Sequence, residues 1–147
     1  YGAYARLELS ATPELPFLGS GLVPREMLEG REYWDLLGFT DRYAATGSEK
    51  ANSFCKLLGH SYQYWSDSAE DFCERAYRKR YGAEDRPHAD PRHPACAARW
   101  INLLQLDSCR EVGWIFDNGY GRVFFMIDED DLKHCRFDRV MVWVDVT

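Results

Sequence analysis

The spacing of hydrophobic and polar positions predicts three elements in the N-terminal third of the chain. Residues 4–10 alternate polar and apolar side chains with a period of two, which is typical of a half-buried strand. Residues 24–37 carry apolar side chains at roughly helical spacing, behind a proline that suits the first position of a helix. Residues 40–53 are polar and contain glycine, which indicates a loop.

Residues 66–82 carry the most consistent helix signals. A Ser or Asp at 66–68 can cap the helix, acidic residues fill its first turn and basic residues its last, and Gly82 suits the C-terminal end. The expected buried stripe consists of Phe72, Cys73, Ala76, Tyr77 and Tyr81. Residues 83–98 hold three prolines and no periodicity, so we expect a surface loop there.

Beyond residue 99 the period changes to two, which predicts a sheet. Asn118-Gly119 favours a two-residue type I′ hairpin, and the acidic run at 128–134 favours a short helix. The predicted strands are 100–106, 112–116, 121–127 and 139–146. This order favours an α+β fold, a mainly antiparallel sheet with two or three helices packed on it, in one domain over residues 1–147.

Composition excludes several classes of protein. With 147 residues, 46% of them hydrophobic, the chain can form one core, and intrinsic disorder is excluded as its main state. A net charge of −6 disfavours nucleic acid as a partner, and no apolar run reaches the length of a membrane span. No secretory signal is visible, and the five cysteines contain no CxxC pair, so we expect reduced cysteines and a cytoplasmic protein.

Known catalytic signatures are missing from the sequence. It contains no GxSxG motif, no P-loop and no GxGxxG motif, so hydrolase, NTPase and dinucleotide-binding activities lose their main support. The acidic run Asp128-Glu129-Asp130-Asp131 is most simply a solvated helix start. No cofactor is predicted, and an enzyme is the less favoured interpretation.

Several short segments occur in the order found in the YwqG-like proteins, a bacterial family of undefined biochemical function. They are 33–37 (YWDLL), 56–60 (KLLGH), 103–108 (LLQLDS), 121–127 (GRVFFMI), 130–132 (DDL) and 137–140 (FDRV). The sequence therefore resembles that family over most of residues 7–146. The resemblance implies a mixed fold of α-helices and antiparallel strands.

The sequence also departs from the family pattern. The proline that usually follows LLG is missing, and the usual tryptophan-glycine-aspartate turn is replaced by 116–119 (FDNG), where Asp117 is an approximate replacement. Family members tend to be longer, with an N-terminal half that this sequence does not show. The resemblance thus allows a reduced family member or the C-terminal part of a longer one.

A polar group at the centre of the family signature is the best candidate binding site. Gln105 and Asp107 share one strand face, and Arg122 on the next strand could meet either of them. On an exposed sheet surface these three side chains would bind a polar ligand. The plainer alternative, which we favour, is a turn aspartate and an ordinary cross-strand partner.

A second candidate site lies in the proline-rich segment. His88, His93 and Cys96 could supply three zinc ligands, with a fourth from Cys73, Cys109 or His60. Their spacing matches no common zinc motif, so a plain surface loop is the favoured interpretation and no metal is predicted.

Aromatic content and charge suggest a protein partner. Tyr62, Trp65 and Tyr120 lie between or beside predicted elements, where they and Asp117 could anchor an interface. Residues 101–147 hold nine acidic and five basic side chains, which favours a basic partner. We therefore expect a non-catalytic protein-binding module, an immunity-type or regulatory partner of a basic protein such as a toxin domain. The alternative is a small-molecule or metal-dependent enzyme at one of the two candidate sites.

Overall fold

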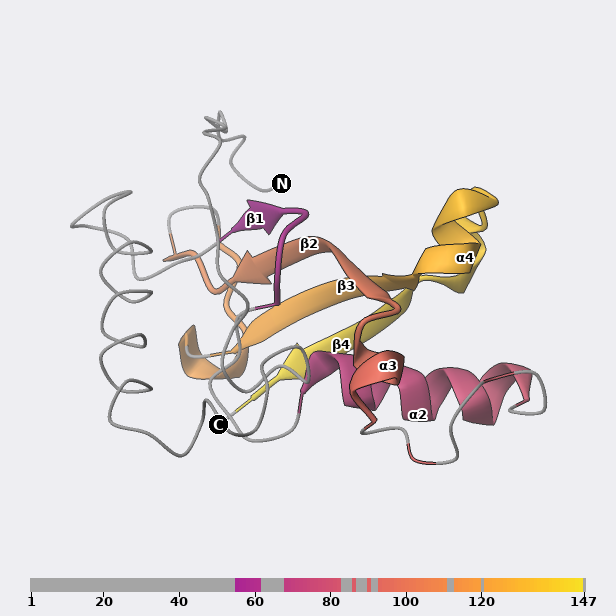
Figure 1. The fold of residues 1–147 in the computed structure, drawn as a ribbon. Coiled ribbons are helices and arrows are strands. Elements are labelled where there is room, and N and C mark those ends of the chain that lie inside the picture. The colour runs from indigo at the N-terminus through magenta and orange to yellow at the C-terminus, as the bar shows by residue number, and fades with distance from the viewer. Residues whose placement is uncertain are drawn as a thin grey trace, which may run out of the picture.

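The computed structural model describes residues 55–61, 68–82, 86, 90, 93–110, 113–119 and 121–146. Four strands form one antiparallel sheet in the order β1-β2-β3-β4 (Figure 1). Their bounds are β1 Lys56–Leu57, β2 Trp100–Asp107, β3 Arg122–Asp128 and β4 Met141–Asp145. Within the described stretches of the chain lie three α-helices: α2 Ala69–Tyr81, α3 Pro94–Ala97 and α4 Glu129–Lys133. The predicted α+β class is confirmed, whereas the elements predicted within residues 4–53 lie outside the described residues.

Helix α2 ends where its capping residues predict. The Ser68 hydroxyl accepts a hydrogen bond from the Asp71 amide at 3.0 Å, and Gly82, at a φ of 88°, donates its N–H to the Arg78 carbonyl at 3.0 Å. Cys73 and Tyr77 of the predicted stripe are buried, but Phe72 and Tyr81 are 38% and 37% exposed. The buried stripe is thus narrower than the sequence suggested.

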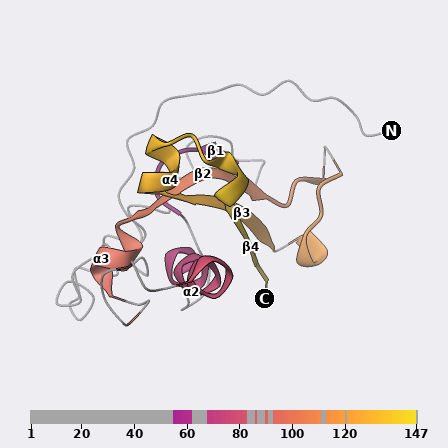
Figure 2. The same cartoon turned by 90° about the vertical axis from the view of Figure 1, so that its right-hand side faces the viewer.

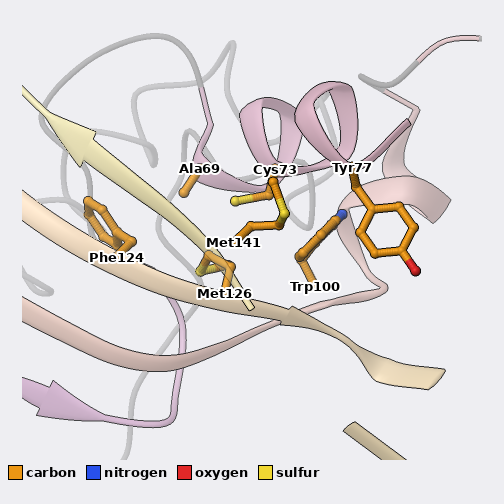
Figure 3. Packing of buried hydrophobic residues seen from close by; sticks show 7 residues of the cluster. All are labelled: Ala69, Cys73, Tyr77, Trp100, Phe124, Met126 and Met141. Carbon is orange, nitrogen blue, oxygen red and sulfur yellow. The ribbon is translucent and has the colours of Figure 1, made fainter. Parts of the chain in front are cut away.

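One face of the sheet packs against α2. The cluster of buried hydrophobic residues consists of Ala69, Cys73, Tyr77, Trp100, Phe124, Met126 and Met141 (Figure 3). Trp143 extends this packing, because its ring stacks between Phe72 at 5.8 Å and Phe124 at 5.3 Å between centroids. Figure 2 shows α2 end-on beneath the sheet.

A β-bulge in β2 determines which of its residues face α2. Asn102 pairs with Met126 while Leu104 pairs with Phe125, so Leu103 is an extra residue on β2. Because of this insertion, Gln105 lies on the same face as Asn102, although the two are three positions apart.

The connection between β2 and β3 differs from the prediction. No strand spans 112–116 among the described residues there; Cys109 and Trp114 form an isolated bridge, and Asp117–Gly119 is a 3-10 helix. Backbone groups in this connection are bound by a side chain, since the Ser108 hydroxyl accepts from the Phe116 amide at 3.0 Å and lies 3.0 Å from the Gly121 carbonyl. The predicted two-residue hairpin at Asn118-Gly119 was wrong, although both residues have positive φ.

The segment predicted as a surface loop at 83–98 contains α3. His93 caps this helix by accepting from the Ala95 amide at 3.2 Å, and Cys96 and Ala97 are buried. The predicted helix with an acidic start is confirmed as α4, with Asp128 as its cap. The interpretation of the acidic run as solvated was wrong for two of its residues, because Asp128 and Asp131 are buried. No helix in the described ranges is long and apolar enough to cross a membrane.

Candidate functional site

The structure brings the three residues of the polar candidate site together. Asp107 on β2 lies directly opposite Arg122 on β3, and Arg122 Nε is 2.8 Å from Asp107 Oδ1. The Gln105 amide donates to the same oxygen at 3.1 Å. The cross-strand contact expected from the sequence therefore exists.

These side chains are buried, not displayed on an exposed surface as expected. Gln105, Asp107 and Arg122 are between 0% and 3% exposed, and they lie on the sheet face that also carries the core. On β4, Asp145 lies directly opposite Arg122 and is buried as well. One guanidinium is thus flanked by carboxylates on both neighbouring strands, a group that we call the Arg122 row (Asp107, Arg122 and Asp145).

Sequence reasoning did not include Asp145 in this site. A signal was present, because Asp145 follows Met141 and Trp143 on the strand face that alternates with the valines. The alternation along β4 does not show that β4 lies beside β3 in the sheet, so the position of Asp145 opposite Arg122 could not be predicted.

The other candidate residues do not join the Arg122 row through any contact shown. Asp117, half-buried, begins the 3-10 helix with a φ of 41°. Tyr62, Trp65, Tyr120 and His88 lie outside the described residues.

His93 and Cys96 both make contacts that hold α3 in place. The His93 ring caps α3, and the buried Cys96 thiol lies 3.5 Å from Arg78 Nη2. Within the described part of the chain, no three His, Cys, Asp or Glu side chains form a group suited to a metal ion.

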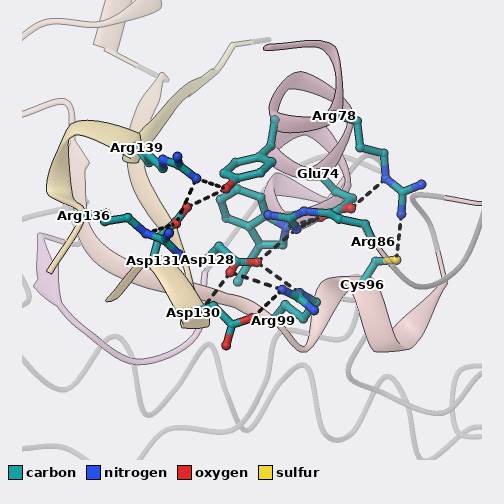
Figure 4. Close-up of polar contacts among 12 residues, drawn as sticks. Glu74, Arg78, Arg86, Cys96, Arg99, Asp128, Asp130, Asp131, Arg136 and Arg139 are labelled. Carbon is teal, nitrogen blue, oxygen red and sulfur yellow. Dashed lines mark hydrogen bonds and ion pairs between the residues drawn. The ribbon is translucent and has the colours of Figure 1, made fainter. Parts of the chain in front are cut away.

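A larger polar cluster, which the sequence analysis did not predict, joins α2 to the end of the sheet where Trp100 and Asp128 pair (Figure 4). Its centre is Glu74, which is fully buried and accepts from three donors: Arg78 Nε at 2.7 Å, Arg86 Nη1 at 2.6 Å and Trp100 Nε1 at 3.0 Å. Arg86 also lies 3.0 Å from Asp128 Oδ2. Arg86 therefore links two buried carboxylates from different elements.

Aromatic rings and a second arginine complete the surroundings of Asp128 and Arg86. The Arg86 guanidinium lies over the Tyr77 ring, 3.8 Å from its centroid, and Arg99 Nε is 3.1 Å from Asp128 Oδ2. Burial by itself raises the pKa of Asp128, but the hydrogen bond from Arg99 and the charges of Arg86 and Arg99 outweigh it, so the pKa lies below its usual value.

Asp131 forms the third buried carboxylate group of this cluster. It accepts from the Tyr77 hydroxyl at 2.8 Å, and Arg136 Nε lies 2.7 Å from its Oδ1. Arg139 donates to the Tyr77 hydroxyl at 3.1 Å. We call Glu74, Arg78, Arg86, Arg99, Asp128, Asp131, Arg136 and Arg139 the arginine network.

These contacts account for part of the acidic excess in residues 101–147, from which the sequence analysis inferred a basic partner. Four of its nine acidic residues are buried beside arginines, namely Asp107, Asp128, Asp131 and Asp145. Glu74, Arg86 and Arg99 come from outside this third of the sequence, so its charge count could not reveal these partners. Nearly half of the acidic side chains in this third are therefore internal.

Three of the described thiols, Cys55, Cys73 and Cys96, are poorly suited to nucleophilic chemistry. Burial is the main cause that raises the pKa of Cys55, Cys73 and Cys96, and the carboxylates near each thiol add to the rise. All five cysteines are free of disulfide bonds. A protonated thiol is a weak nucleophile, and these three remain protonated at neutral pH.

The sheet face turned away from α2 is apolar across all four strands. We call it the far face; the register gives it one row of Leu57, Leu104, Phe125 and Val142 and a second of Leu106, Val123 and Val144. Its residues at the two edges of the sheet are exposed: Leu57 by 62%, Val142 by 50% and Val144 by 43%. Val146, just past β4, is 54% exposed.

Comparison with known proteins identifies a family but no characterised relative. The family model described as a domain of unknown function, DUF1963, matches residues 20–146. No curated protein and no solved structure matches the chain significantly.

Proposed function

The chain belongs to the DUF1963 family of unknown function, and from this premise we propose that it is a non-catalytic protein-binding module that binds its partner through the far face. The observation that carries the proposal is the row of half-exposed valines on β4, Val142 and Val144, continued by Val146. A contiguous apolar surface of this kind is typical of a protein interface, whereas a single exposed valine is not. The occupant that we propose is a protein with an apolar contact surface of its own.

The polar clusters support a binding function over a catalytic one. A general acid or base needs a pKa close to neutrality, but arginines hold the pKa of Asp128 below its ordinary value. In the enzymatic alternative, Gln105, Asp107 and Arg122 would act on a substrate. Their side chains are buried and already hydrogen-bonded or ion-paired to one another.

Our finer proposal concerns the partner and the setting. We propose that the module is a bacterial, cytoplasmic, YwqG-like protein and an immunity-type or regulatory partner of a basic protein such as a toxin domain. The six sequence segments shared with the YwqG-like proteins support the first part. For the second part, exposed carboxylates remain around α4, at Glu129, Asp130 and Asp138. Two of these have cations of their own: Glu129 pairs with Lys133 and Asp130 with Arg99.

Site-specific photocrosslinking in the native cell tests the proposal. A benzoyl-phenylalanine replaces Val144 on the far face or, as a matched control, the exposed Lys79 on α2. We expect a discrete protein adduct from position 144 and none from position 79. Absence of an adduct at 144, or the same adduct from both positions, would contradict the far face as the binding surface.

Irradiation in a cell lysate at increasing salt, instead of in the intact cell, separates the general proposal from the finer one. An interface that is mainly apolar keeps its adduct yield at high salt, because screening acts on charge pairs. A yield that falls steeply with salt would instead indicate a complex held by the carboxylates around α4 and a basic partner.

A further inference from the structure

A buried amide on β2 points to a polar ligand inside the domain. Asn102 is 2% exposed, and neither its Nδ2 nor its Oδ1 has a hydrogen-bond partner among the residues that the structure describes. Its neighbours on the same face differ in this respect, because Trp100 donates to Glu74 and Gln105 donates to Asp107. Asn102 thus stands out on a strand face where other buried polar groups are bonded.

The backbone beside Asn102 is irregular at the same place. The extra residue of the bulge, Leu103, directly follows Asn102, and the regular pairing with β3 is interrupted between Asn102 and Leu104. Leu103 uses its carbonyl oxygen toward β1, where it accepts from the Leu58 amide at 3.0 Å. A bulge leaves its extra residue unpaired with the neighbouring strand, which here is β3.

An unsatisfied amide of this kind is costly. Removing a polar side chain from water without new hydrogen bonds costs far more than an ordinary hydrogen bond contributes, and native proteins rarely tolerate it. A carboxamide presents a donor and an acceptor side by side, and one water molecule can accept from the first and donate to the second. Buried waters commonly make about three hydrogen bonds to groups that lack protein partners.

We propose that Asn102 and the bulge at Leu103 hold a single ordered water molecule within the domain. The amide supplies one donor and one acceptor, and the backbone at the bulge supplies the remaining contact. This site is independent of the far face and of the proposed binding function.

The sign of a stability change tests the water site. Asn102→Leu keeps the branching and the number of side-chain heavy atoms but removes both polar atoms. If the water is present, this variant expels it and strands the backbone groups at the bulge, so we expect a melting temperature lower by about 3 °C. If the amide has no bound water, the melting temperature of the variant should rise, because the substitution then removes a buried polar group that has no hydrogen-bond partner. Met126→Leu, at the cross-strand partner, is the matched control for repacking alone.

A crystal structure of the unsubstituted protein, at a resolution that shows ordered solvent, tests the site without a variant. We expect one density peak of the size of a water molecule within hydrogen-bonding distance of the Asn102 amide. A continuous dry contact around the amide would contradict the proposal. Density larger than one water would also overturn it, because the site would then hold a different ligand.

Discussion

The two faces of the sheet differ in a way that hydrophobicity alone does not predict. The face against α2 carries the Arg122 row, Asp128 and Trp100, whose indole N–H donates to Glu74. All of these side chains are almost completely buried. The far face is apolar from Leu57 to Val142, yet its edge residues are about half exposed. Charges on the first face pair internally, whereas on the second face the central Val123 is buried and only the edge residues remain exposed.

The largest effect is expected from breaking the Arg122 row. Arg122→Met leaves two buried carboxylates, Asp107 and Asp145, without the guanidinium between them, and breaking a buried ion pair typically costs about 4 kcal/mol of folding free energy. Denaturant unfolding measures this loss. Arg80→Met, at an exposed arginine on α2, is the control and should leave stability nearly unchanged.

A somewhat smaller loss is expected at the centre of the arginine network. Glu74→Gln keeps the side-chain shape but removes the charge shared by Arg78 and Arg86, which should cost about 3 kcal/mol because both guanidiniums remain largely buried. Thermal and denaturant unfolding measure the change. Glu129→Gln, in an exposed pair with Lys133, serves for comparison; an equal loss there would contradict the special position of Glu74.

The pH dependence of stability should distinguish Asp128 from exposed carboxylates. Its pKa is lower in the folded protein, so the carboxylate contributes stability above its ordinary pKa, and this contribution disappears as the pH falls through the lower folded value. We expect Asp128→Asn to flatten the loss of stability below about pH 4. Asp138→Asn, at an exposed position, is the control. Acid titrations of the unfolding free energy that run parallel for Asp128→Asn and the unsubstituted protein would contradict this role.

The smallest effect on folding is expected on the far face. Val142→Lys with Val144→Lys places charges at positions that are already about half exposed, so the unfolding free energy should change by less than about 1 kcal/mol. A loss comparable to that of Arg122→Met would show that these valines belong to a packed interior, and the contrast between the two faces would fail.

Local sequence signals predicted much of the fold because they act over a few residues. Ser68 and Gly82 bound α2 as expected, and β4 alternates as its valines predicted. The connection after Asp107 was predicted wrongly, because the Ser108 hydroxyl binds backbone groups that a hairpin strand would have paired. Side-chain hydrogen bonds of this kind leave no periodic signal.

The candidate site shows the same limit at longer range. The meeting of Asp107 and Arg122 followed from neighbouring strands, but their burial depends on which sheet face carries the core. The arginine network was missed because Glu74, Arg86 and Asp128 come from three separate segments. Only the folded chain shows that these charges neutralise one another.

Partner retention by the far-face variant tests the central claim most directly. The protein carrying Val142→Lys and Val144→Lys is purified from the native cell beside the unsubstituted protein, and the amount of copurified partner is measured for each. We expect the variant to keep its stability and lose the partner. Full retention of the partner by a folded variant would contradict a binding function of this face.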